Sequence, residues 1–443
     1  MTAFGPLFVP ERLLDAVSDS AWLQAMLETE RALASAEARA GIVPADAATA
    51  IADSCHSELY ETETLAREGG SVGNPAEPLV RALRERVGGE AARYVHWGAT
   101  SQDVMDTASM LVARRALDLI VVELDRISAA LAGLAETHRS TPMAARTLLQ
   151  QAVPTTFGFK VAGWLVAVQE ARGRLRAIRS ERLAAQLGGA AGTLAPLGER
   201  GVDVLRLFSE ELGLAEPVLP WHTNRARIAE LGGALETTAG ALGKIGLDIV
   251  LLAQTEVGEV SEGRAGGSST LPQKLNPVRS TLARACAHLV SGYASVLSRT
   301  LIQEHERAAG AWHAEWEALS GALAFTGGAA AAIAEALEGL EVDAARMRRN
   351  LELTEGLILA ERVAFSLAEQ HGRAEAHEVV RETVRRASGS GRTFGEELRA
   401  DGRVDLSEAE LTELLDPTTY LGSAEAFVDR ALEQYRRERS EEA

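Results

Sequence analysis

The chain has 443 residues, of which 46% are hydrophobic and 24% are charged, enough for a buried core and more than one domain. Its 45 Lys and Arg residues against 63 Asp and Glu residues give a net charge of −18. That balance argues against nucleic acid and anionic membranes as partners. Two widely separated cysteines, Cys55 and Cys286, predict neither a disulfide scaffold nor a structural zinc site.

The sequence carries no sign of export or membrane insertion. Residues 1–10 lack a basic segment followed by an apolar run, and no uncharged apolar run reaches spanning length. We therefore expect a soluble, cytoplasmic protein. The many Ala, Leu, Glu and Arg residues are good helix formers, which favours an α-helical chain.

The helical periods divide the chain into three parts. Apolar residues recur at helical spacing in residues 20–41, 45–59 and 78–86, with a glycine-rich break at 69–75, and these predict a small N-terminal domain, residues 1–100. Helices this long must bury their apolar stripes against neighbours, so residues 101–341 predict a central long-helix bundle; the long patterns cover residues 104–134, 157–187, 225–256 and 281–297.

Shorter patterns at 358–369 and 374–387 predict a C-terminal helical domain, residues 342–443, whose charged tail from residue 436 we expect to fray. The predicted fold class is therefore all-α, with three helical domains. No internal repeat is evident.

A polar, glycine-rich loop at residues 263–279 interrupts the helical patterns. Residues 266–277 read G-G-S-S-T-L-P-Q-K-L-N-P. Glycines allow backbone amides to converge on an anion, while Ser268 offers a hydroxyl, Lys274 a positive charge and Asn276 amide donors. A hydroxyl that must lose a proton needs such neighbours, so we predict a catalytic loop; a mobile surface loop is the alternative.

Residues 96–103, H-W-G-A-T-S-Q-D, precede the helix expected at 104–134. The start of a helix with hydroxyl side chains attracts carboxylates, although a simple helix cap explains the same residues. Further phrases are W-H-T-N-R at 221–225, Q-E-H-E-R at 303–307 and W-H-A-E-W at 312–316. Their spacing of His and Glu is not that of a known metal motif, so we predict no metal site.

Together these phrases resemble the fumarase/aspartase superfamily over essentially the whole chain. The cycloisomerase branch, which acts on 3-carboxy-cis,cis-muconate, is the most similar, because it shares H-W-G-A-T-S-Q-D, Q-E-H-E-R, W-H-A-E-W and G-N-x-x-x-P-L-V at 73–80. The resemblance implies a homotetramer with active sites shared between subunits, a small anionic di- or tricarboxylate substrate, and no metal or organic cofactor.

The resemblance also implies roles for particular residues. Ser268, Lys274 and Asn276 are the implied catalytic residues. The implied substrate-binding residues are His96, Thr100, Ser101, Gln102, Arg146, Thr147, Gln151, His222, Arg225, Ser269, Glu304, His305 and Arg307. For His222 and Arg225, a turn histidine and a solvated arginine are equally good interpretations, and packing or subunit contacts also account for Glu304, His305 and Arg307.

The chain departs from the superfamily where histidines are expected. Leu148 occupies the position where fumarases and adenylosuccinate lyases have a histidine, and Thr281 the position of the glutamate that orients it. Cycloisomerases also lack this His–Glu pair. Gln151 and Gln273 stand where cycloisomerases have histidine, and Leu275 where they have arginine. Glutamine forms hydrogen bonds but does not titrate, so the departures bear on the substrate more than on the fold.

The expected reaction is a reversible anti addition–elimination next to a carboxylate. We expect Ser268 to act as base and acid, with loop amides and the nearby helix end stabilising its alkoxide. The first hypothesis is cycloisomerisation of 3-carboxy-cis,cis-muconate to 4-carboxymuconolactone. The alternatives are a lyase that releases fumarate and a good leaving group, for example a nitrosuccinate lyase, and a non-catalytic helical oligomer.

Overall fold

The computed structural model describes residues 4–263, 267, 271 and 273–442. The chain is predominantly α-helical, which confirms the predicted fold class. Two compact units are distinguished by their internal contacts. The first comprises Met1–Asp125, Glu170–Gly246 and Thr281–Ala334; the second comprises Arg126–Gln169, Leu247–Ser280 and Glu335–Ala443. The three-domain division stays a prediction.

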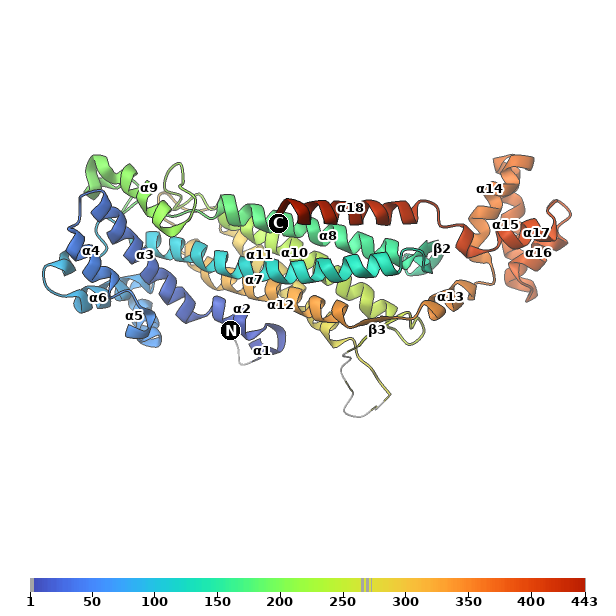
Figure 1. Ribbon diagram of the computed structural model, residues 1–443, viewed down its shortest axis with the longest axis horizontal. Helices are drawn as coiled ribbons and strands as arrows, with labels where there is room; N and C mark the ends of the chain where they lie inside the picture. Colours follow the sequence, from blue (N-terminus) through green and yellow to red (C-terminus); the bar gives the residue numbers. More distant parts are fainter. Residues whose placement is uncertain (1–3, 264–266, 268–270, 272, 443) are drawn as a thin grey trace. The chain divides into compact units, whose positions relative to one another are not determined.

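The N-terminal helices belong to the first unit, and α3, α4, α5 and α6 group together (Figure 1). Ser18 caps the long helix α3, its hydroxyl accepting from the Ala21 amide, so that helix begins two residues before the sequence predicts. The helices here are α1 (Gly5–Phe8), α2 (Glu11–Ala16), α3 (Asp19–Arg39), α4 (Ala45–Ala52), α5 (Thr62–Val72) and α6 (Ala76–Val87), with 3-10 turns η1 (Ser57–Leu59) and η2 (Ala91–Tyr94).

The four long helices predicted for the bundle form as α7 (Ser101–Thr137), α8 (Phe157–Ala177), α10 (Ala226–Leu252) and α11 (Val278–Arg299), with α8 ending ten residues before the predicted end at 187. A fifth long helix, α12 (Ala311–Glu338), is one that the sequence analysis did not predict. Each contributes residues to both compact units. Shorter elements between them are a π-turn η3 (Ile178–Arg182), a 3-10 segment η4 (Ala195–Arg200) and α9 (Gly201–Leu212).

Two of these helices are buried on nearly every face. Residues 102–113 of α7 are all buried, polar positions included. Among the described residues α12 is the one helix long and apolar enough to cross a membrane by length and composition, but 89% of its most apolar window is buried inside the protein. Packing in a protein core therefore accounts for its composition.

A β-hairpin occupies residues 142–156, which lie between the helical patterns at 104–134 and 157–187. Strands β1 (Pro142–Thr147) and β2 (Gln150–Thr156) are antiparallel, with Arg146 opposite Gln151. Leu148 and Leu149 form the turn with φ of 50° and 65°, and the Leu148 side chain is 97% exposed. Hairpin turns of this kind favour Asn and Gly, so two leucines at these positions do not predict a turn from the sequence. A second short ladder pairs β3 (Val260–Glu262) with β4 (Leu340–Val342).

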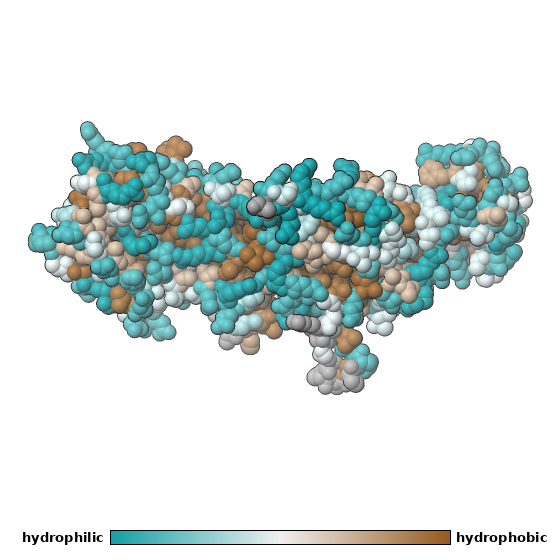
Figure 2. Space-filling view, in the orientation of Figure 1, coloured by the Kyte–Doolittle hydropathy of each residue, from teal (hydrophilic) through white to brown (hydrophobic). Residues whose placement is uncertain are grey.

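The C-terminal helices of the second unit form a small cluster with its own apolar core (Figure 1). Phe394 and Leu398 are completely buried in that core, and the visible face of the cluster is largely hydrophilic (Figure 2). Its elements are η5 (Leu357–Leu359), α14 (Ala360–His371), α15 (Arg373–Ser390), α16 (Phe394–Ala400) and α17 (Glu408–Leu414). Helix α13 (Ala344–Glu352) packs instead against β1, and η6 (Pro417–Thr419) follows α17.

The final helix, α18 (Ala424–Glu442), corrects the expectation of a frayed tail. Arg436 pairs with Glu136, and Glu438 accepts a hydrogen bond from Gln169. These partners, all in the second unit, extend the helix through the charged segment.

A buried carboxyl group on α3 has no partner. Glu37 is 0% exposed, and neither carboxylate oxygen accepts a hydrogen bond from a described residue. Burial, and next the charge of Glu30, raises the pKa of the Glu37 carboxyl from 4.5 to about 9. Between those values the folded chain keeps a proton that the unfolded chain releases, so stability falls as pH rises.

Replacing Glu37 by glutamine should remove this pH dependence. Glu37→Gln keeps the shape of the protonated acid and should raise the free energy of unfolding at pH 7 by about 3 kcal/mol. Urea unfolding at pH 5, 7 and 8.5 should show a gain that grows with pH. A gain that is the same at every pH would contradict the assignment of the proton to Glu37.

Candidate active site

The start of α7 is fixed by the carboxylate of Asp103, which is 1% exposed. Asp103 accepts hydrogen bonds from the backbone amides of Thr100 (3.0 Å), Gly188 (3.0 Å) and Gly189 (2.8 Å). His222 Nε2 lies 2.6 Å from its Oδ1. One carboxylate therefore ties two other loops to the first turn of the helix.

Gly189 shows how closely these loops approach. Its φ is +68°, and a Cβ there would lie 2.6 Å from the carbonyl oxygen of Gly98. A side chain at residue 189 would push the loop away from the turn that precedes α7. The glycine-rich loop at 188–194 thus packs directly on the H-W-G-A-T-S-Q-D segment.

Two hydroxyls at this helix start are uncommitted. Among the described residues, neither the Thr100 nor the Ser101 side chain has a hydrogen-bond partner. Partial positive charge at a helix N-terminus and free hydroxyl donors suit a carboxylate. The geometry is therefore consistent with the binding role predicted for Thr100 and Ser101.

Arg225 lies in a buried ion cluster, not in an open anion site. It is 1% exposed, and its guanidinium donates to both oxygens of Asp106 (2.8 and 2.9 Å) and to both oxygens of Glu315 (3.0 Å to Oε1). Trp312 Nε1 donates to Asp106 as well (2.9 Å). Protein carboxylates thus occupy the guanidinium of Arg225. We therefore interpret Arg225 as a positioning residue and not as a residue that contacts a ligand.

The opposite charges of this cluster shift the pKa values of its members toward their charged forms. Burial lowers the pKa of Arg225, but the Asp106 and Glu315 carboxylates outweigh burial and raise it. Burial raises the pKa of Glu315, and Arg225 opposes that rise. The guanidinium is thus charged, and the cluster depends on it.

Gln102 and Arg307 connect this cluster to the loops. Gln102 donates to Asp106 (3.0 Å) and to the His222 carbonyl (2.8 Å), and it accepts from Arg307 (3.0 Å). Arg307 also donates to the carbonyls of Gly189 and residue 190. Gln102, His222, Arg225 and Arg307, predicted separately as site residues, therefore form one network inside the first unit.

Glu304 and His305 are exposed and stand apart from that network. The Glu304 carboxylate accepts from the Ala309 amide (3.0 Å), a bond that lowers its pKa. His305 has a φ of 44° in the same loop. Their predicted binding roles stay predictions.

The hairpin residues are held by a cluster in the second unit. Arg146 forms two hydrogen bonds to buried Glu259 (2.7 and 2.9 Å), and Asn350 donates to the same carboxylate (2.7 Å). Gln151 donates to the Asn350 carbonyl (2.8 Å), while its own oxygen is buried without a described partner. Thr147 is exposed next to the Leu148–Leu149 turn.

The predicted catalytic loop is described only in part. Ser268 and Ser269 lie outside the described residues, so their predicted roles rest on the sequence. Lys274 and Asn276 line a cavity of about 790 Å³ in the second unit, together with Gln273 and Glu262. No ion pair joins Lys274 to another described residue.

The start of α11, next to this loop, is already occupied. Glu262 accepts hydrogen bonds from the backbone amides of Arg279 (3.1 Å) and Ser280 (2.8 Å). A protein carboxylate thus takes up the amides that we expected to stabilise the Ser268 alkoxide. Among the described groups, Lys274 is left as the nearby positive charge in the loop.

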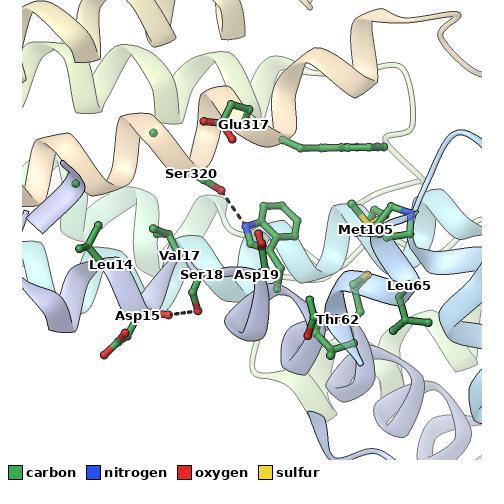
Figure 3. A pocket seen from close by; sticks show the side chains of 18 of the residues that line it. Leu14, Asp15, Val17, Ser18, Asp19, Thr62, Leu65, Met105, Glu317 and Ser320 are labelled. Carbon is green, nitrogen blue, oxygen red and sulfur yellow. Dashed lines mark hydrogen bonds between the residues drawn. The ribbon is translucent and has the colours of Figure 1, made fainter. Parts of the chain in front are cut away.

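A cavity of about 470 Å³ in the first unit is less suited to a polycarboxylate (Figure 3). Asp19 from α3 and Glu317 and Ser320 from α12 lie around it, and Trp22 Nε1 donates to Ser320 (2.9 Å). Asp15, Asp19 and Glu317 form no salt bridge with a described residue. Their negative charge opposes an anionic substrate.

The residues missed by the sequence analysis are mostly acidic partners, Glu30, Asp103, Asp106, Glu259, Glu262 and Glu315. Two acids three residues apart at the start of an otherwise apolar helix, Asp103 and Asp106, were a usable signal, because buried charges require partners. The described residues hold no group of three or more His, Cys, Asp or Glu side chains placed to bind a metal ion.

The chain belongs to the lyase family and is an enzyme of the fumarase/aspartase superfamily. Residues 10–292 match the family described as lyase, and residues 356–431 match the adenylosuccinate lyase C-terminus. The recognition made from the sequence phrases is therefore confirmed.

The chain is most informatively compared with cycloisomerases and a lyase within this superfamily. The chain is 49% identical to the 3-carboxy-cis,cis-muconate cycloisomerase of Pseudomonas aeruginosa, covering 98% of this chain and 96% of that protein. It is also 49% identical to the nitrosuccinate lyase of Streptomyces davaonensis, over 94% and 91% of the two chains. The crystal structure of 3-carboxy-cis,cis-muconate lactonizing enzyme from Pseudomonas putida superposes with a TM-score of 0.92 at 45% identity, covering 98% and 99%.

Removing the central cation of the buried cluster should destabilise the protein. Arg225→Met leaves Asp106 and Glu315 unpaired in the interior, so the free energy of unfolding should fall by about 3–5 kcal/mol. The matched control is Arg182→Met, which breaks an exposed pair with Glu230 and should cost at most about 1 kcal/mol. Equal losses in urea unfolding would contradict the assigned role of Arg225.

Proposed function

We propose that the enzyme converts 3-carboxy-cis,cis-muconate to 4-carboxymuconolactone. The observation that carries this proposal is the likeness to a cycloisomerase across nearly the full length of both chains. The structural likeness to a lactonizing enzyme at 45% identity supports it further. The proposed substrate is a small tricarboxylate, and the chemistry requires no metal or organic cofactor.

The reaction closes a ring by intramolecular addition. A carboxylate oxygen of the substrate bonds to a carbon of the double bond, and the π electrons move toward the carbon that bears another carboxylate. That carboxylate becomes a dianionic aci-carboxylate until its α-carbon takes up one proton. In the reverse direction the proton leaves first and the ring C–O bond then breaks.

We assign the proton transfer to the Ser268 hydroxyl. Lys274 and Asn276 are proposed to hold the carboxylate whose charge grows, because they line one cavity next to the loop. Thr100 and Ser101 are proposed to hold another carboxylate at the start of α7. Since Glu262 occupies the α11 amides, we assign stabilisation of the alkoxide to Lys274 and to amides of the loop itself.

The missing histidines are compatible with this chemistry. The group that leaves in the reverse reaction is a carboxylate, which departs without being protonated, so a strong general acid is less necessary than for ammonia or hydroxide. The Gln151 amide is bonded to the Asn350 carbonyl and therefore has a structural partner of its own.

A nitrosuccinate lyase is the second proposal, and it rests on the 49% identity to such an enzyme. Nitrite is also a good leaving group, so the same loop chemistry serves it. The two activities differ in their products: a lyase releases fumarate and nitrite, and a cycloisomerase releases neither.

Both proposals are tested by one set of assays. Purified enzyme should remove the ultraviolet absorbance of 3-carboxy-cis,cis-muconate, and Ser268→Ala should lower kcat at least about 100-fold because the proton donor is lost. Ser291→Ala, an exposed serine on α11, is the control and should behave as wild type. An unchanged absorbance together with nitrite release from nitrosuccinate would replace the first proposal by the second.

We further propose a cytoplasmic homotetramer with active sites completed between subunits. Exposed apolar side chains along the long helices support an assembly, for example Leu247 on α10 and Leu289 and Val296 on α11.

Sedimentation equilibrium should give four times the 47.1-kDa mass of the chain. Leu289→Glu places a charge on the exposed apolar face and should lower that mass, whereas Glu338→Gln on the charged surface should not. A wild-type protein that sediments as a monomer while fully active would overturn shared active sites.

A further inference from the structure

Glu30 on α3 makes one specific contact, to a residue of the H-W-G-A-T-S-Q-D segment. Its Oε1 lies 2.6 Å from His96 Nδ1, and the two side chains are 1% and 14% exposed. Its second oxygen is buried without a hydrogen-bond partner among the described residues. A carboxylate so placed needs an opposite charge, and His96 is its neighbour.

The surrounding charges favour the protonated imidazole. Burial is the largest influence on the pKa of His96 and lowers it, but the charge and hydrogen bond of Glu30 and the charge of Asp103 outweigh burial. Arg84 opposes them, and the net result is a raised pKa. The imidazole therefore donates its Nδ1–H to Glu30, and the raised pKa favours its charged form.

The backbone of His96 is also unusual. Its φ of 60° lies in the left-handed region, which a residue with a side chain adopts at a cost of about 1–3 kcal/mol. In this conformation the Nδ1 atom of His96 contacts its buried partner, Glu30. Nε2 has no hydrogen bond to a described residue.

We propose that Glu30 is a positioning residue that holds His96 so that its Nε2–H donates a charge-assisted hydrogen bond to a substrate carboxylate at the start of α7. His96 lies five residues before Ser101, and Gly98, two residues after His96, packs against Gly189, whose amide donates to Asp103 in the first turn of α7. The proton stays on His96, so no bond to carbon is made or broken by it.

This pair is made of different residues from the superfamily's histidine and glutamate, which are Leu148 and Thr281 here. The Glu30–His96 pair supplies a positive charge to the site, although Gln151 in the hairpin and Gln273 in the loop replace the histidines of cycloisomerases. The inference rests on the proposed function for the nature of the substrate, but the contact between Glu30 and His96 does not.

The test measures binding of propane-1,2,3-tricarboxylate by calorimetry between pH 5.5 and 9, which needs no turnover. For the wild type, affinity should fall as pH rises through the pKa of His96. Glu30→Gln should weaken binding about tenfold at pH 7 and move the fall to lower pH, because the imidazolium loses its carboxylate. His96→Gln should make affinity independent of pH in that range.

The controls separate positioning from folding. Glu37→Gln, another buried carboxyl on the same helix, should bind the probe as wild type. Glu30→Asp keeps the charge and should recover part of the affinity, and thermal melting checks that each variant folds. In the His96→Gln background, adding Glu30→Gln should change nothing further.

Two results would overturn the proposal: wild-type affinity in Glu30→Gln, or effects of Glu30→Gln and His96→Gln that simply add. A protein that binds the probe with the expected pH dependence, yet leaves 3-carboxy-cis,cis-muconate unchanged, would contradict only the assigned substrate.

Discussion

The first unit depends on one buried carboxylate, that of Asp103. It accepts three backbone amides and faces His222, so three segments distant in sequence meet at the start of α7. A hydrogen bond to a charged group contributes about 1.5–3 kcal/mol, and none of these segments can leave without stranding buried polar groups. The hydroxyls of Thr100 and Ser101 therefore rest on a fixed base, which suits residues that must present donors to a ligand.

Most charged groups of the candidate site are paired with other protein groups. Arg225 carries the positive charge of the buried cluster, yet Asp106 and Glu315 are paired with it. Glu262 likewise takes up the amides at the start of α11. Among the described residues, Lys274 forms no ion pair, whereas His96 is paired with Glu30 through Nδ1 and keeps Nε2 without a hydrogen bond.

The sequence predicted the long helices well, because apolar residues at helical spacing extend over many turns. It missed the hairpin, since Leu148–Leu149 lacks the Asn or Gly typical of its turn and Pro154 argues against a strand. It found Gln102, His222, Arg225 and Arg307 through a family likeness but not their mutual contacts. Those contacts join residues more than a hundred positions apart, such as Arg225 and Asp106, and a single sequence carries no record of pairing.

The cluster of Arg225, Asp106 and Glu315 also limits how the protein can evolve. Losing Arg225 alone leaves two carboxylates without a counter-charge in the interior, whereas losing Asp106 or Glu315 alone still leaves one cation with one anion. Arg225 can therefore be replaced only together with the acids or after them, while either acid can change first. Descendants of this chain are thus expected to vary at an acid before they vary at the arginine.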